Sequence, residues 1–70
     1  MITLSELLDR LYYEMTRSPL DTPLAVMQDK KMFFGTSHDE HIRQLIIKRP
    51  YVKRWAVYND ESEIMIELEG

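Results

Sequence analysis

A hairpin that is apolar on both faces is the feature that most constrains this chain. Leu24–Gln28 and Lys31–Phe34 are short apolar runs joined by Asp29-Lys30, and they are predicted to pair as antiparallel strands. Asp-Lys is a poor two-residue turn, because such turns favour Asn-Gly or Asp-Gly, so the register stays open. An antiparallel sheet needs only one buried face. The rest of the chain must therefore cover this hairpin on both sides, or one apolar face stays open.

Side-chain alternation divides this hairpin into two sets. If Gln28 pairs with Lys31, then Leu24, Val26 and Phe33 share one face. The residues of the other face are Ala25, Met27, Met32 and Phe34. We predict that this second set is a protein-binding surface, because exposed apolar patches usually mark interfaces and methionine adapts its shape to a partner. The alternative is that a helix or a long loop of the same chain covers it.

Two helices are predicted, each introduced by a capping-box pattern and each stopped by a proline. Thr3 with Glu6 opens a helix over Leu4–Arg17, and Ser37 with Glu40 opens one over His38–Lys48. The second segment has a competing interpretation. Residues 44–48 contain a short apolar run with β-branched side chains, which also suits a strand.

The last third of the chain predicts a second hairpin, from Tyr51–Tyr58 and Ser62–Leu68. One of its faces is mainly apolar, and the other pairs Arg54 with Glu67. Each half of the chain is then a capped helix followed by a hairpin, with a weak internal repeat between the halves. We expect a single domain over residues 1–70, an α+β two-layer sandwich of order αββαββ. Its four-stranded antiparallel sheet would carry two helices on one face, around a pseudo-two-fold axis.

The length and composition exclude several classes of protein. Seventy residues bury too little surface to be very stable alone, so self-association as a homodimer is a reasonable expectation. The chain has no cysteine, which excludes a disulfide framework and fits a cytoplasmic location. Its start lacks the pattern of a signal peptide, and its apolar runs fall far short of the roughly 20 residues of a membrane span.

Catalytic and metal-binding patterns are scarce. The chain has two glycines and no phosphate-binding loop, nucleophile elbow or spaced carboxylate pair. We therefore expect no enzyme and no cofactor. His38 and His41 lie one helical turn apart, but their spacing differs from that of a zinc protease, and we expect no metal site.

A basic segment suggests nucleic-acid binding as the alternative function. Five cations and three aromatic residues lie between residues 41 and 58, where there is no acidic residue. Cations bind phosphates, and aromatic rings stack on bases. The basic residues are Arg43, Lys48, Arg49, Lys53 and Arg54. The net charge of −3 and the pI of about 5.2 favour the protein-binding hypothesis, because nucleic-acid-binding domains are generally basic.

Two segments, MITLSELLDRL and PLAVMQDKKMFF, resemble the small accessory proteins encoded by tailed bacteriophages and prophages. Many of these open with a short strand-like segment and a capped helix, followed by β-hairpins. The resemblance implies a protein of the host cytoplasm that binds a host or phage component. It often implies an inhibitor of a defence or transcription machine. It transfers no site residue to this chain.

Overall fold

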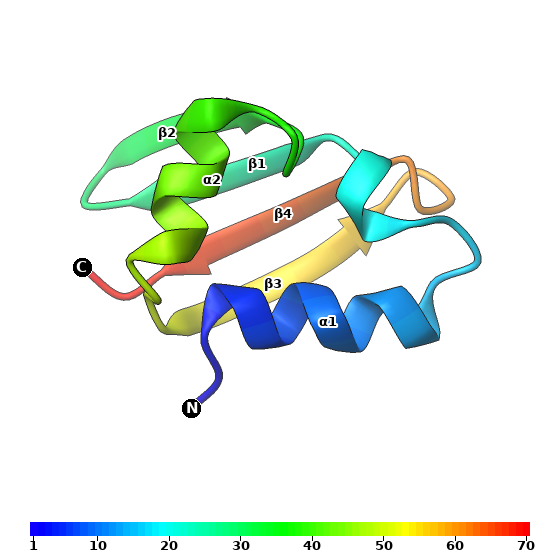
Figure 1. The fold of residues 1–70 in the computed structure, drawn as a ribbon, viewed down its shortest axis with the longest axis horizontal. Coiled ribbons are helices and arrows are strands. Elements are labelled where there is room, and N and C mark those ends of the chain that lie inside the picture. The colour runs from blue at the N-terminus through cyan, green and yellow to red at the C-terminus, as the bar shows by residue number, and fades with distance from the viewer.

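The computed structural model describes residues 1–70 and shows two helices packed on one face of a four-stranded sheet (Figure 1). The elements in chain order are α1 (Leu4–Glu14), the 3-10 turn η1 (Pro19–Asp21), β1 (Leu24–Gln28), β2 (Lys31–Gly35), α2 (Glu40–Ile47), β3 (Val52–Tyr58) and β4 (Glu63–Leu68). The predicted α+β class and the order αββαββ are confirmed. The second half contains a helix over residues 40–47, so the strand interpretation of residues 44–48 is wrong.

The strand order is β2-β1-β4-β3, and the central strands β1 and β4 run parallel. The prediction of an all-antiparallel sheet is therefore wrong. A two-fold axis perpendicular to a sheet relates antiparallel strands, so the parallel central pair also excludes the predicted pseudo-symmetry. The lysine and arginine residues of the sheet lie on its edge strands. Lys31 lies on β2, and Lys53 and Arg54 lie on β3, which suits these strands to the edges, whereas the acidic residues of β4 lie on a central strand.

The register within each hairpin follows the predicted alternation. All five pairs between β1 and β2 are as predicted, and both turn residues, Asp29 and Lys30, adopt the positive φ of 52° and 66° that tight hairpins need. In the second hairpin, the predicted pairs from Arg54 to Tyr58 are confirmed. A β-bulge then places Val52 opposite Leu68, where Lys53 was predicted.

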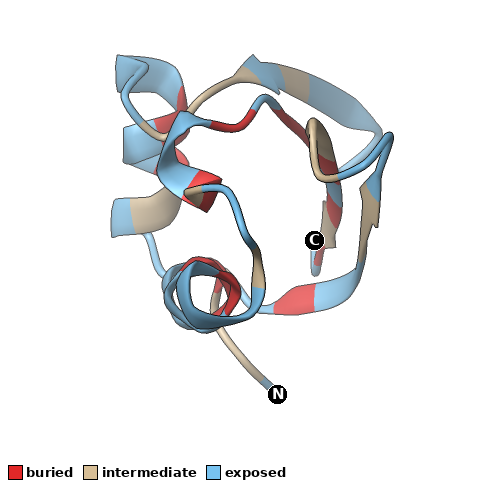
Figure 2. Ribbon diagram, turned by 90° about the vertical axis from the view of Figure 1, so that its right-hand side faces the viewer, coloured by how far each residue is buried: buried red, intermediate tan, exposed pale blue.

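The hydrophobic core lies between the helices and the sheet (Figure 2). It is built from one face of each helix and the inward-facing side chains of the strands. Its members are Leu4, Leu7, Leu8, Leu11, Leu24, Val26, Ile42, Leu45, Val52, Ile64, Ile66 and Leu68. Neither helix is long and apolar enough to cross a membrane.

The helix ends show which capping signals are used. The Thr3 amide donates to Glu6 Oε1 at 2.9 Å and the Glu6 amide donates to Thr3 Oγ1 at 3.2 Å, so the first capping box is confirmed. The second is wrong. Helix α2 has Asp39 as its N-cap, without a side-chain cap, and the Ser37 hydroxyl donates to the Leu20 carbonyl at 3.2 Å. The Ser37 hydroxyl, which the local pattern predicts as the helix cap, forms a tertiary hydrogen bond instead.

Helix α1 ends at Glu14, three residues earlier than predicted, because the next backbone groups bind elsewhere. Glu61 Oε1, in the turn between β3 and β4, accepts from the Thr16 amide at 2.8 Å, the Thr16 hydroxyl at 2.7 Å and the Arg17 amide at 3.2 Å. These bonds, with that of the Thr16 hydroxyl the strongest, hold the pKa of Glu61 below its ordinary value of 4.5. One carboxylate thus ties the end of α1 to the second hairpin.

Replacing this carboxylate by an amide, Glu61→Gln, is expected to lower stability at neutral pH. Because the pKa of Glu61 is lowered on folding, its contribution is present above 4.5 and is lost as the pH falls through the lowered folded value. The difference between wild type and Glu61→Gln should therefore shrink as the pH falls below 4.5. Urea unfolding at a series of pH values measures it. A difference that stays constant across this range would show that the carboxylate's charge contributes nothing.

Candidate protein-binding surface

The sheet face opposite the helices has no element packed over it (Figure 2). Strand register places its side chains in two rows that run from β2 across β1 and β4 to β3. The first row is Phe34, Ala25, Met65 and Ala56, and the second is Met32, Met27, Glu67 and Arg54. We call these two rows the open face. It is apolar over β2 and β1 and along the whole first row, and it is charged in one corner.

All four residues predicted for protein binding lie on the open face. The Phe34 side chain is 66% exposed, Met32 is exposed and Met27 is half-buried. Ala25 is only 3% exposed, because the longer side chains of Phe34 and Met65 flank it on both sides. The alternative, in which a helix or a loop of the same chain covers this surface, is not what the structure shows.

Part of this surface comes from the second hairpin, which the sequence reasoning had assigned to charge pairing. Met65 and Ala56 complete the first row, and Tyr58 lies exposed beyond Ala56 on β3. The alternation did place Ala56 opposite Met65. Only the pairing of β1 with β4 sets Met65 beside Ala25 and joins the two apolar areas into one surface.

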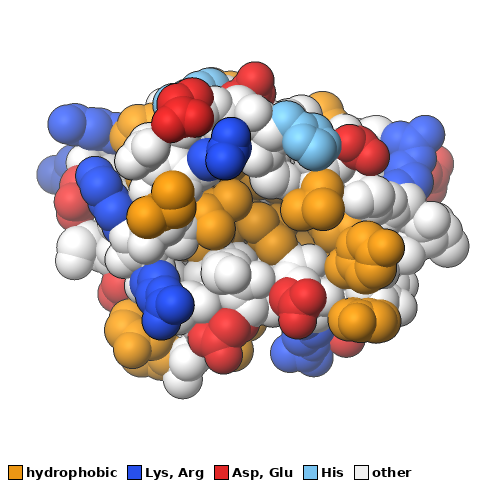
Figure 3. Space-filling model, viewed as in Figure 1, with side chains coloured by type: hydrophobic (Ala, Val, Ile, Leu, Met, Phe, Trp, Pro, Cys, Tyr) orange, Lys and Arg blue, Asp and Glu red, His pale blue; other side chains and the backbone are white.

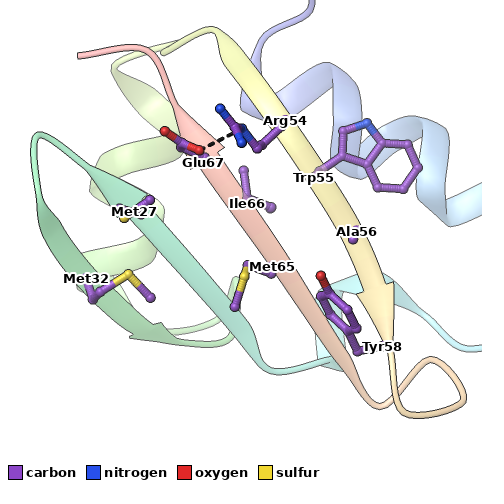
Figure 4. Close-up of a pocket in the computed structure, with 9 residues that line it drawn as sticks. All are labelled: Met27, Met32, Arg54, Trp55, Ala56, Tyr58, Met65, Ile66 and Glu67. Carbon is purple, nitrogen blue, oxygen red and sulfur yellow. Dashed lines mark ion pairs between the residues drawn. The ribbon is translucent and has the colours of Figure 1, made fainter.

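A hollow of about 300 Å³ extends across the open face and is lined by residues of all four strands, from Met32 on β2 to Ala56 on β3 (Figure 4). The small side chain of Ala56 leaves space there between Tyr58, Met65 and Arg54. Most of its lining is hydrophobic, and Trp55 lines it at the outer edge of β3. The hollow is large enough for an apolar side chain of a partner.

An ion-paired cluster closes one corner of the open face. Arg54 Nε lies 2.8 Å from Glu67 Oε1, as the register predicted, and Lys53 Nζ lies 3.6 Å from Glu67 Oε2. The Glu67 side chain is 23% exposed and the two cations are more exposed. Both cations of β3 therefore share one acidic partner, so this corner keeps a net charge of +1.

The five cations of the basic segment do not gather on one surface. Lys53 and Arg54 belong to the sheet and share Glu67, whereas Arg43 belongs to α2 and lies 3.8 Å from a carboxylate oxygen of Glu40. The remaining two, Lys48 and Arg49, follow the end of α2. On the helix side, acidic and basic side chains are interspersed (Figure 3). This arrangement lacks the continuous basic track that a nucleic-acid backbone needs.

The two histidines bind different neighbours. His38 Nε2 lies 2.8 Å from Asp21 Oδ1, and His41 Nε2 donates to the Phe34 carbonyl at 2.6 Å. No group of three metal-ligating side chains comes together anywhere in the chain. The role of His41 is structural, because it satisfies a backbone carbonyl of the edge strand β2.

No known protein family, curated protein or solved structure matches this chain. The open face is therefore the feature of this chain that bears on its function.

Proposed function

We propose that this chain is a non-enzymatic binding module that contacts another protein through the open face. The exposure of Phe34 carries the proposal, since two thirds of a large aromatic side chain is in solvent beside three methionines. A contiguous apolar patch of this kind usually marks an interface. Complete burial of one Phe side chain contributes about 1.5–3 kcal/mol, so Phe34 is the expected anchor.

The composition of the patch supports a protein as the partner. Met27, Met32 and Met65 have flexible thioether side chains that adjust to the shape of a second surface. The resemblance of the first helix and hairpin to phage accessory proteins suggests a host or phage protein, which the chain inhibits or modulates on binding. The dispersed and paired cations offer less support for a nucleic acid.

Capture of partners by Phe34→Glu tests this proposal. Ile47→Glu is a matched control, because Ile47 is also 66% exposed and lies on α2, on the other side of the molecule. Immobilised wild type and Ile47→Glu should retain the same proteins, including the chain itself, from a nuclease-treated cell extract. Phe34→Glu should retain at least tenfold less, since it places a charge at the anchor.

Circular dichroism and thermal unfolding must first show that both variants are folded. A folded Phe34→Glu that retains as much protein as wild type would contradict the proposal. Capture that disappears only on nuclease treatment would favour the nucleic-acid alternative instead.

A further inference from the structure

We propose that the partner for the open face is a second copy of this chain, packed face to face about a two-fold axis. The axis is parallel to the strands and passes between β1 and β4. This inference rests on the proposed function, because it needs the open face to be an interface, and it names the partner that the face fits.

The first row of the open face is self-complementary in size. Along Phe34, Ala25, Met65 and Ala56, large and small side chains alternate. A two-fold axis between β1 and β4 sets each residue against its counterpart across the sheet. Phe34 then lies over the second copy's Ala56, and Met65 lies over its Ala25. Every large side chain meets a small one, which is how well-packed faces interdigitate.

The hollow supplies the matching cavity for the anchor. Phe34 is exposed on β2 at one end of the first row, and Ala56, one of the residues that line the hollow, lies at the other end. The proposed axis exchanges these ends, so each copy inserts its Phe34 ring into the other's hollow, whose lining Figure 4 shows. The contact between Phe34 and the hollow therefore occurs twice in the dimer, as contacts in isologous dimers generally do.

The alternative axis, perpendicular to the strands, fits poorly. It exchanges the two rows and places Phe34 over Met32, so that two large side chains collide. Both axes set one methionine over Glu67, Met27 under the axis parallel to the strands and Met65 under the other, so this contact does not distinguish them. Under the axis parallel to the strands, the second row instead sets Met32 against the aliphatic part of Arg54, a favourable contact for both side chains.

Continuation of the sheet through its edges is disfavoured as a route to self-association. On the β2 edge, His41 already occupies the Phe34 carbonyl. On the β3 edge, the Val52 amide donates to the Ile2 carbonyl at 2.8 Å, and the bulge disrupts the ladder next to it. Occupied and bulged edges resist pairing with another chain, which leaves the open face for contact.

The charge and the area of the open face set the expected affinity of the dimer. The charged corner, where two cations share Glu67, has a net charge of +1, and the remaining residues of the two rows are uncharged. Strand spacing and rise give four strands of about five residues a face of roughly 19 Å by 17 Å, which is well below the area of about 800 Å² per partner that standard interfaces bury. We therefore expect a weak dimer, with a dissociation constant at the upper end of the micromolar range.

A reciprocal exchange of residues tests this geometry. Phe34→Ala removes the ring that enters the hollow, and Ala56→Phe fills the hollow that receives it. Each single variant should therefore weaken dimerisation at least tenfold. In the double variant, the ring introduced at position 56 faces the space vacated at position 34 of the second copy. Dimerisation should then return to within about threefold of wild type, as expected for directly coupled positions. Sedimentation equilibrium measures each constant, and Ala56→Leu replaces Ala56→Phe if the latter does not fold.

Three outcomes would overturn the proposal. A wild-type chain that stays monomeric up to about 1 mM excludes the second copy as partner. If Phe34-dependent capture of another protein persists in that case, the proposed function survives alone. A dimer that tolerates both single variants, or one that the double variant fails to restore, excludes the proposed axis.

Discussion

Replacement of Ile66 by alanine is expected to lower the free energy of unfolding by about 3 kcal/mol. Ile66 is fully buried at the middle of β4, where it lies between Val26 and Trp55 in the sheet and faces the helices. Truncation of such a side chain leaves a cavity and typically costs about 2–5 kcal/mol. A chain of this length has a total stability of about 3.5–10 kcal/mol, so this one change should remove roughly a third of it or more.

The adjacent residue on the same strand provides the control. Met65 points to the open face and is 42% exposed, so Met65→Ala should cost well under half as much in the monomer. Urea unfolding followed by the fluorescence of Trp55, the only tryptophan, measures both variants at low protein concentration. Equal losses for Ile66→Ala and Met65→Ala would contradict the one-sided burial of β4.

A charge at the centre of the open face should have the largest effect on association. Met65 lies in the first row between Ala25 and Ala56, so any partner that covers this face must bury it. Met65→Glu then places a carboxylate in a dry interface where the neighbouring cation, Arg54, is already paired with Glu67, which costs several kcal/mol. We expect association to weaken by at least about 100-fold, while the monomer stays folded because the side chain is exposed there.

Two controls accompany this variant. Met65→Leu keeps an apolar side chain of similar volume and should associate nearly as well as wild type. Ile47→Glu adds the same charge on α2 and should have little effect. Sedimentation of the wild type and the three variants shows which side of the molecule forms the contact. The opposite pattern, with Ile47→Glu dissociated and Met65→Glu unaffected, would move the interface to the helices.

Local patterns in the sequence predicted the elements and the pairing within each hairpin. Alternation with a period of two residues fixes which side chains of β1 and β2 share a face, and it needs no knowledge of the rest of the chain. A local capping pattern does not by itself decide which residue caps a helix, because distant segments compete for the same side chain. Thr3 caps its helix as predicted, whereas the Ser37 hydroxyl is bound by a carbonyl from a distant segment.

The strand order was not predictable from alternation, because a meander and the observed order bury the same apolar faces. What distinguishes them is that β2 and β3 carry lysine and arginine, which favours the edges of the sheet. The same limit applies to the open face. The sequence predicted its β1–β2 half, but Met65 and the hollow over Ala56 join it only through the parallel pairing of β1 with β4.

The five methionines allow a direct test of the open face as the contact surface. Met27, Met32 and Met65 lie on that face, whereas Met15 packs against the core and Met1 is exposed at the N-terminus. Methyl NMR with a soluble paramagnetic agent, recorded from dilute to concentrated protein, reports the solvent exposure of each. We expect the three open-face methyl groups to lose their exposure together as the chain associates, while Met1 and Met15 stay unchanged. Association that leaves Met32 and Met65 as exposed as in the monomer would contradict this account.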